Sequence, residues 1–501
     1  MNKTVNWIIE VFMNNSRDIR SAIGPAAILM ILIVMLASTA SSLTLEEAID
    51  LGLNHTARGS MIEGNLEVAE QNYFARRINF YLPEISIKGS VPSYSVDESY
   101  RFFGGSPVKK LFETRDLGFN SFVELNQSLL TGGDVRVTAN LLSQKDRYPN
   151  TRLDDGSFID ERTRQGYFTF SYTQPLLKPS NARHQLKNTR DDFEIARLSK
   201  IEEETTLKKE IIEAYMGVLQ LSIKKDMSEA GYEAARLQTE IDSLKLADEI
   251  LSEEDYLGSV SGSLDAELDK FEVETQLEEK ERQLAILLDK DVFADQSLIE
   301  PVLQSHIEPN KRAALMNGWE LSVPARKAEL QYKKARREAD YKASGHGLTG
   351  DLTANYSTGN GYIKTDDVRE DIDTKGWGIS LNFSLPLWDG GSSGASVKAA
   401  NLQAEQARLE LERTRQNAKA EIVNLVNALD VSYRRLDIMK KQIDLARNRL
   451  NIAQGRYGDG RISRIEYLET QKIYLETKYE YLQELKAYLI NRAELDGKYM
   501  E

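Results

Sequence analysis

The 501-residue sequence contains no cysteine, only 11 prolines and four histidines. The absence of cysteine excludes disulfide frameworks, thiol catalysis and cysteine-ligated zinc, and four scattered histidines leave little scope for a histidine metal site. There is no lysine-rich block, and 64 basic against 78 acidic residues give a net charge of −14, so we expect no nucleic-acid partner. Phosphate-loop, H-E-x-x-H and G-x-S-x-G motifs are also absent from the sequence. We therefore expect no enzyme activity, no cofactor and no metal site.

Long apolar runs are scarce as well, and the strongest one extends only from Ala26 to Leu36. As a helix it would be about 16 Å long, about half of a bilayer core. Basic residues precede it, and Ser38 and Ala40 supply small residues for cleavage after Ala40. This pattern predicts a signal peptide at residues 1–40 and an exported protein, the alternative being an uncleaved anchor helix.

The remaining sequence contains an internal repeat. Residues 249–257 and 460–468 share an aliphatic residue, a serine, an acid three positions later and a Tyr-Leu pair. The same offset of 211 relates Pro175 to Pro386. We therefore predict two structural repeats, residues 41–300 and 301–501, with an extra hairpin at about residues 116–163 of the first.

Long helices are expected in both repeats. Small or apolar residues recur in steps of three and four from Ala400 to Ala453, the pattern of a coiled-coil seam. This pattern predicts a helix over residues 391–457, about 100 Å long, and its counterpart over 180–247. An ordinary helical bundle is the alternative, but such bundles seldom need helices of this length. The expected shorter partners are residues 44–80, 252–289, 311–343 and 463–495.

Between the helices, apolar and polar residues alternate strictly over segments of 9 to 11 residues, as in residues 348–356 and 377–385. This period of two is typical of transmembrane β-strands, and a soluble sandwich is the alternative. With the extra hairpin the chain would supply six strands, below the floor of about eight for a closed barrel with a lumen. Several chains must then share one barrel.

Five segments carry a family resemblance. They are Leu43-Thr44-Leu45-Glu46-Glu47-Ala48, Tyr81-Leu82-Pro83-Glu84-Ile85-Ser86, Thr173-Gln174-Pro175-Leu176-Leu177, Leu385-Pro386-Leu387-Trp388-Asp389-Gly390-Gly391 and Tyr457-Gly458-Asp459-Gly460-Arg461-Ile462-Ser463. In order, spacing and duplication they resemble the TolC-type outer-membrane efflux protein family over nearly all of residues 43–497. The resemblance implies an α+β, mostly α fold: coiled-coil hairpins form a periplasmic tunnel, and antiparallel strands join a shared transmembrane β-barrel of 12 or 18 strands.

The resemblance also implies partners and a location. The expected assembly is a homotrimer embedded in outer-membrane lipid of a Gram-negative-type cell. It would dock on a periplasmic adaptor (membrane fusion) protein, and through it on an inner-membrane pump of RND or ABC type, for efflux or type I secretion. We therefore expect a passive export duct. A non-conducting periplasmic scaffold is the main alternative, and a secreted hydrolase is a remote third.

The helix tips carry the candidate functional residues. Ser252 and Ser463 each precede an acid by three positions, Asp255 and Glu466, which is the spacing of a capping box. In the family-like tip turn, Gly460 and Ile462 are expected to contact the adaptor together with both serines. Simple helix initiation is the alternative role for the serines.

Two further roles follow from the resemblance. Glu466 and Glu469 lie three residues apart, on one helix face, and match acids that line the periplasmic entrance in the family. In a trimer each would form a ring of three carboxylates that favours cations; a solvated helix face is the alternative. Asp255 and Tyr457 match positions of links that hold the family's entrance closed, and Arg461 lies one residue from the expected arginine.

Overall fold

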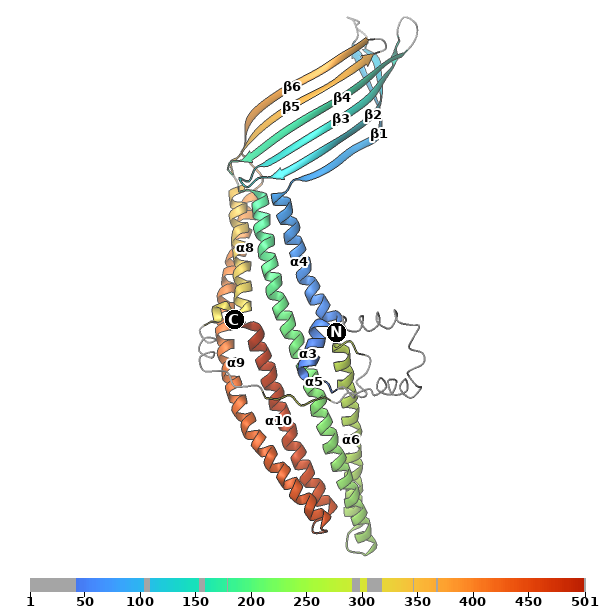
Figure 1. Ribbon diagram of the computed structural model, residues 1–501, viewed down its shortest axis with the longest axis vertical. Coiled ribbons are helices and arrows are strands. Elements are labelled where there is room, and N and C mark those ends of the chain that lie inside the picture. Colours follow the sequence, from blue (N-terminus) through green and yellow to red (C-terminus); the bar gives the residue numbers. More distant parts are fainter. Residues whose placement is uncertain are drawn as a thin grey trace, which may run out of the picture. The chain divides into compact units, whose positions relative to one another are not determined.

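Figure 1 shows the computed structural model of the chain, which describes residues 42–102, 109–152, 158–177, 179–290, 298–303, 318–345, 347–365 and 368–499. The predicted signal peptide therefore lies outside the described residues and stays a prediction. The chain divides into two compact units. Unit 1 comprises Met1–Gly59, Leu207–His306 and Leu429–Arg492, and unit 2 comprises Ser60–Thr206, Ile307–Ala428 and Ala493–Glu501.

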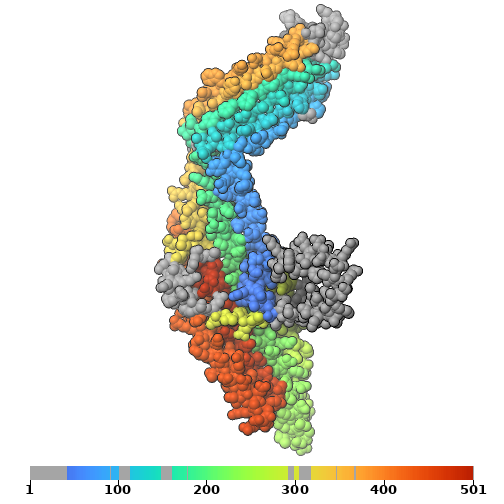
Figure 2. Space-filling model, viewed as in Figure 1, coloured from blue at the N-terminus to red at the C-terminus, as the bar shows by residue number. Residues whose placement is uncertain are grey.

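Unit 2 contains one antiparallel sheet, in which the described residues form six strands in the order of the chain. The strands are β1 (Glu84–Phe102), β2 (Lys109–Ser128), β3 (Asp134–Arg152), β4 (Phe158–Pro175), β5 (Thr349–Thr365) and β6 (Val368–Ser384). Figure 2 shows them packed side by side from β1 (blue) to β6 (orange), with no helix over the face in view. The sheet is thus a single layer whose two edges are β1 and β6.

The strands have 17 to 20 residues, longer than the 9 to 11 expected from the alternation. They continue because antiparallel pairing satisfies the backbone whatever the side chains are. The charged stretch Val368–Asp373 of β6, for example, pairs in register with Asn360–Thr365 of β5. Strands β2 and β3 form a hairpin over residues 109–152, which overlaps the extra hairpin expected at about residues 116–163.

Helices make up the rest of the described chain. They are α3 (Leu45–Asn54), α4 (Ala57–Tyr81), α5 (Asn181–Ala247), α6 (Glu253–Leu287), the short 3₁₀ helix η1 (Trp319–Leu321), α8 (Val323–Gly345), α9 (Ser392–Gly458) and α10 (Arg464–Lys498). No helix of the described residues is both long enough and apolar enough to span a membrane.

The helix expected over residues 44–80 is broken at His55. Thr56 ends the continuity: its hydroxyl donates to the carbonyl of Gly52 at 2.6 Å and accepts the amide of Gly59 at 3.1 Å. The Ala57 amide donates to the carboxylate of Asp289, at 2.6 Å. The start of α4 is therefore fixed by side chains rather than by a preceding turn of helix.

The long helices repeat in register. Helices α5 and α9 both have 67 residues, α6 and α10 both have 35, and each second copy begins and ends 211 residues after the first. Their coiled-coil stripe is buried, as the fully or nearly fully buried Ala418, Ile422, Leu429 and Leu436 of α9 show. We propose on this basis that residues 41–300 and 301–501 are two copies of one ancestral unit.

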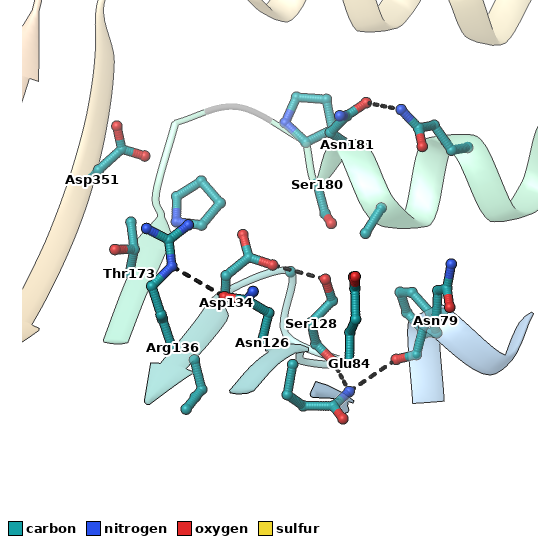
Figure 3. A pocket seen from close by; sticks show the side chains of 18 of the residues that line it. Asn79, Glu84, Asn126, Ser128, Asp134, Arg136, Thr173, Ser180, Asn181 and Asp351 are labelled. Carbon is teal, nitrogen blue, oxygen red and sulfur yellow. Dashed lines mark hydrogen bonds between the residues drawn. The ribbon is translucent and has the colours of Figure 1, made fainter. Parts of the chain in front are cut away.

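A cavity of about 810 Å³ lies in unit 2 where the sheet meets the ends of its helices (Figure 3). Asn126, Asp134, Arg136 and Thr173 line it from the sheet. From the helices come Arg76, Asn79, Asn181, Gln185 and Tyr341. The helix residues and the sheet residues that line the cavity therefore face a common space. These sheet residues belong to the polar face of the sheet.

Candidate functional sites at the sheet faces and the helix tips

One face of the sheet is apolar. Phe170, Tyr356 and Trp377 are cross-strand neighbours on β4, β5 and β6, and each is exposed. By the alternation of strand side chains, Tyr167 and Val368 point to the opposite face, whereas the same face carries most of the large exposed apolar side chains of the sheet. The side chains on the apolar face are Ile85, Ile87, Tyr94, Val96, Leu117, Phe119, Val123, Leu141, Phe168, Ile379, Leu381 and Phe383, with Tyr100 near the end of β1.

The opposite face is polar and internally hydrogen-bonded. The hydroxyl of Ser171 donates to Asn355 at 2.8 Å, and Asn382 donates to the hydroxyl of Thr353 at 2.9 Å. Glu124, almost completely buried, accepts the ammonium of Lys88 at 2.7 Å. A sheet with one apolar and one hydrated face separates a nonaqueous from an aqueous phase.

The apolar band crosses the strands obliquely. Its middle on β6, Ser380, is level through the hydrogen-bond register with Thr173 of β4, whereas its middle on β1, Ser90, is level with Gln165. Thr173 and Gln165 are eight residues apart on β4, which corresponds to about 27 Å along the strand. The five strand spacings between β1 and β6 add up to about 24 Å across the sheet. The implied strand tilt of about 45° relative to the band is that of membrane-spanning barrel strands.

The two helix hairpins end in the same turn. Between α5 and α6 the Ile250 amide donates to the carbonyl of Lys245 at 2.8 Å. Between α9 and α10 the Arg461 backbone amide donates to the carbonyl of Arg456, also at 2.8 Å. The residue before each donor has a left-handed backbone. It is Glu249, with φ of 58°, in the first hairpin and Gly460, with φ of 71°, in the second.

Opposite substitutions at these two positions are expected to shift stability in opposite directions. A left-handed backbone costs a residue with a Cβ about 1 kcal/mol relative to glycine. Glu249→Gly should therefore slow local hydrogen exchange in the first turn, whereas Gly460→Ala should speed it in the second by about fivefold. Ala247→Gly, at the last residue of α5, is the matched control and should only destabilise. Faster exchange after Glu249→Gly would contradict the strain at Glu249.

Both predicted cap serines occupy helix starts. Ser252 accepts the amide of Asp255, and Ser463 accepts that of Glu466, each at 3.1 Å. The reciprocal half of the first box differs from the expectation: the Asp255 carboxylate accepts the Ser252 hydroxyl at 2.6 Å instead of the Ser252 amide. A complete capping box occurs at the start of α3, between Thr44 and Glu47.

The other tip residues lie at the surface. Glu466 and Glu469 are exposed on the face of α10 away from the buried Leu468, as their spacing of three predicts. Gly460 is exposed and Ile462 is half-buried. Among the described residues no cluster of three or more histidines or carboxylates could hold a metal ion.

The three expected closing residues are not joined to one another within one chain. Arg461 lies 3.6 Å from the carboxylate of Asp459 in its own turn, and Asp255 bonds to Ser252. The ring of Tyr457 stacks on Tyr467 with centroids 5.5 Å apart. Links between chains involving these residues stay a prediction.

An arginine that belongs to none of the sequence motifs joins the two hairpins. Arg464 of α10 donates through Nε and Nη2 to the two carboxylate oxygens of Glu233 on α5, at 3.2 and 3.1 Å. Its guanidinium also lies over the rings of Tyr457 and Tyr467, 5.5 and 5.3 Å from their centroids. A bidentate pair with two cation–π contacts is a strong fastening for a half-buried group. The sequence does hold one signal, because an arginine in the first turn of a helix opposes the helix dipole.

The first hairpin has a second fastening. Asp242 of α5 is buried and accepts hydrogen bonds from Ser259 of α6 at 2.6 Å, Gln238 at 2.9 Å and Lys245 at 3.0 Å. These bonds lower the pKa of Asp242 to about 2, so it is ionised at any physiological pH. The equivalent position of the second hairpin, 211 residues later, is Ala453. Near its tip the first hairpin is therefore stabilised by hydrogen bonds to an ionised carboxylate, which the second hairpin lacks.

Comparison with known proteins identifies the second repeat directly. A family model described as "Outer membrane efflux protein" matches residues 325–497, which extend from α8 through β5, β6 and α9 into α10. Over these residues, which make up the greater part of the second repeat, the chain matches the outer membrane efflux protein family. It is thus an outer membrane efflux channel rather than an enzyme, and the predicted family, location and lack of catalysis are confirmed. No curated protein matches the chain in sequence.

Solved channel structures have the same fold as this efflux protein. The Campylobacter jejuni CmeC outer membrane channel is 14% identical, with a TM-score of 0.59 and coverage of 91% of this chain and 87% of that chain. For VceC of Vibrio cholerae the values are 14%, 0.57, 91% and 97%, and for the open state of the Neisseria gonorrhoeae MtrE channel 14%, 0.51, 90% and 88%. The predicted fold class, long helices with an antiparallel sheet, is confirmed.

Proposed function

We propose that three copies of the chain form one continuous export duct, in which their sheets close a single barrel. The open sheet carries this proposal: six strands are too few to enclose a lumen, and both edge strands, β1 and β6, are free to pair. Because β1 and β6 run in opposite directions, β6 of one copy can pair antiparallel with β1 of the next. Three copies would supply 18 strands, with the apolar face toward lipid and the polar face toward the lumen.

Two unpartnered apolar stripes in unit 1 support the same assembly. On α9, Val431, Ile438, Leu445 and Ile452 are each more than half exposed and recur every seven residues. On α6, Leu257, Leu264, Leu268 and Phe271 are likewise more than half exposed, in steps of seven, four and three. Exposed apolar residues with this spacing form a coiled-coil surface against which another helix can pack. Neighbouring copies would cover both stripes and close the helices into a tunnel.

The tips would meet the partner proteins. The first hairpin turn is acidic, since Asp248, Glu249, Glu253, Glu254 and Asp255 are all exposed there. The second turn carries the basic residues Arg456 and Arg461. We assign the tip, including Ser252, Ser463, Gly460 and Ile462, to a periplasmic adaptor linked to an inner-membrane pump of RND or ABC type. Such an adaptor would have to present unlike charges to the two hairpins.

The test is conduction by the purified protein in planar bilayers. A trimeric duct with carboxylate rings should pass small, cation-selective currents. Glu466→Gln with Glu469→Gln should bring the cation-to-anion permeability ratio down about threefold, because six carboxylates would leave the entrance of the trimer. Glu476→Gln with Glu480→Gln, farther along α10, is the charge-matched control and should leave the ratio largely unchanged.

A monomeric particle that never conducts would overturn the duct and favour the periplasmic scaffold. Conduction with unchanged selectivity after loss of Glu466 and Glu469 would leave the duct standing and reduce these acids to a solvated helix face.

A further inference from the structure

The first three turns of α5 present a basic face in unit 2. Arg183, Lys187 and Arg190 are exposed, and their spacing places them within about 60° of one another around the helix. None of the three forms an ion pair with the part of the chain that the structure describes. In a protein of net charge −14, three such cations in one place form a local positive surface.

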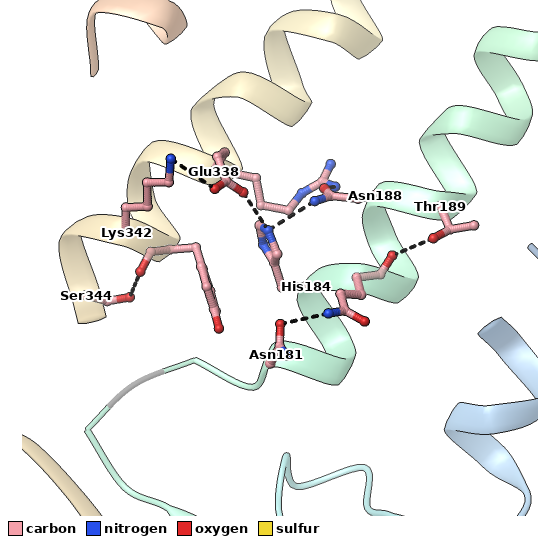
Figure 4. Close-up of polar contacts among 10 residues, drawn as sticks. Asn181, His184, Asn188, Thr189, Glu338, Lys342 and Ser344 are labelled. Carbon is pink, nitrogen blue, oxygen red and sulfur yellow. Dashed lines mark hydrogen bonds and ion pairs between the residues drawn. The ribbon is translucent and has the colours of Figure 1, made fainter. Parts of the chain in front are cut away.

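The other sides of α5 are occupied by its own chain. On one side His184 lies 2.9 Å from the carboxylate of Glu338 on α8, and Asn188 accepts Arg337 at 2.6 Å (Figure 4). On the other side Phe193 stacks on Tyr73 of α4 with ring centroids 5.9 Å apart.

Asn181 and Gln185 of α5 line the cavity beneath the polar face of the sheet (Figure 3). Arg183, Lys187 and Arg190 lie on the face opposite Gln185, at 100° per residue. They therefore point away from the lumen proposed above.

Aromatic side chains border the basic face. Phe74 and Tyr81 of α4 lie seven residues apart and are both more than half exposed, and Arg77 lies between them. The chain continues from Tyr81 through the exposed Leu82 to Ile85, where the apolar face of the sheet begins. Arg183 to Arg190 fall within about 15 Å of the sheet-side end of α5. Aromatic and basic side chains at the margin of an apolar band are typical of the membrane interface.

Three carboxylates of α5 and α8 beside this face are engaged with cations of their own chain. Asp191 pairs with Arg337 of α8, and Glu194 lies 3.8 Å from Arg197 one turn along. On α8, Asp340 lies one turn from Arg336 and attracts it. The cations of α5 are thus available to an external anion.

We propose that this basic collar, defined as Arg77, Arg183, Lys187 and Arg190 with Phe74 and Tyr81, binds phosphate headgroups of anionic phospholipid in the adjacent membrane leaflet. The proposal rests on the proposed function, which places the sheet in the membrane. Guanidinium groups bind phosphate oxygens through paired N–H donors, and basic residues beside a membrane attract anionic lipid. The aromatic rings would seat the acyl region, which a purely polar ligand such as a peptidoglycan fragment does not need.

The test measures binding of short-chain phosphatidylglycerol and phosphatidylcholine to the full chain in detergent by native mass spectrometry. The wild type should bind phosphatidylglycerol about fivefold more tightly than phosphatidylcholine, and added salt should reduce the difference. Arg183→Gln with Lys187→Gln and Arg190→Gln should abolish the preference. The matched control replaces three exposed basic residues of another helix, α9, as Lys419→Gln with Lys440→Gln and Arg449→Gln. This variant should retain the preference for phosphatidylglycerol.

An equal preference in the collar variant and the wild type, or no preference in the wild type, would overturn the proposal. So would binding of a muropeptide in place of phosphatidylglycerol. The same samples are tested in planar bilayers, where the collar variant should conduct as the wild type does. Conduction without lipid preference refutes the collar alone, whereas a wild type that never inserts refutes the duct.

Discussion

Replacing Arg464 by alanine is expected to raise the open probability of the free channel about tenfold. Arg464 and Glu233 link α10 of the second hairpin to α5 of the first through two hydrogen bonds. Both side chains are about one-third exposed, so solvent screening reduces the pair to about 1.4 kcal/mol. If the open state lacks this link, that free energy is a tenfold change in the closed-to-open ratio. Single-channel recording in planar bilayers measures it.

A double-mutant cycle with Glu233→Gln separates the link from other effects of the substitutions. Each single variant should leak, and the double variant should leak little more than either, because both remove the same interaction. Arg461→Ala is the control, since Arg461 approaches only Asp459 within its own exposed turn. Additive effects of Arg464 and Glu233, or an equal leak in the Arg461 variant, would contradict a closing role for the pair of Arg464 and Glu233, which we name the latch.

The latch assigns different parts to the two hairpins. Asp242 holds α5 to α6 through Ser259, whereas position 453 of α9 is an alanine and supplies no such bond. Loss of Arg464 would therefore release the second hairpin while the first keeps its own tip fastening. Opening would then be a movement of α9 and α10 about a first hairpin that stays fixed.

The long helices could be predicted closely, because their stripes recur over many turns. The helices expected over residues 180–247 and 391–457 begin and end within one residue of α5 and α9. The break at His55 was only partly foreseeable, since Thr56 caps the new helix locally but the Ala57 amide bonds to Asp289, 232 positions away along the chain. The strand lengths were wrong because alternation reports only the apolar band, while hairpin pairing continues beyond it.

The candidate site was only partly predictable for a related reason. Caps are local, so the spacing of Ser252 and Ser463 from their acids sufficed to place both serines at helix starts. The pair between Arg464 and Glu233 joins residues 231 positions apart, and neither belongs to a motif. Such contacts depend on how the two hairpins pack against each other. The sequence repeat shows that there are two hairpins, but it does not determine which of their residues meet.

Tyr215→Phe is expected to lower the local stability of unit 1 by about 2 kcal/mol. The Tyr215 hydroxyl is completely buried and lies 2.7 Å from the carbonyl oxygen of Leu43 and 2.8 Å from that of Ile299, whose amide it accepts at 3.0 Å. Burial raises its pKa to about 12, so the proton needed for donation is present throughout the physiological range. Phenylalanine would remove the hydrogen bonds by which Leu43 and Ile299 are tied to α5, and among the residues described the Leu43 carbonyl would keep only the bond from the Ile299 amide, at 3.1 Å.

Hydrogen exchange of the segments around Leu43 and Ile299 is the direct measurement, and a loss of 2 kcal/mol corresponds to about 30-fold faster exchange. Tyr499→Phe is the comparison, because the Tyr499 hydroxyl, buried in unit 2, donates a single hydrogen bond to Ala418, at 2.9 Å. It should cost about 1 kcal/mol and leave exchange around Leu43 unchanged. Equal exchange in Tyr215→Phe and the wild type would mean that the parallel bridge between Leu43 and Leu298 holds the segment without the hydroxyl.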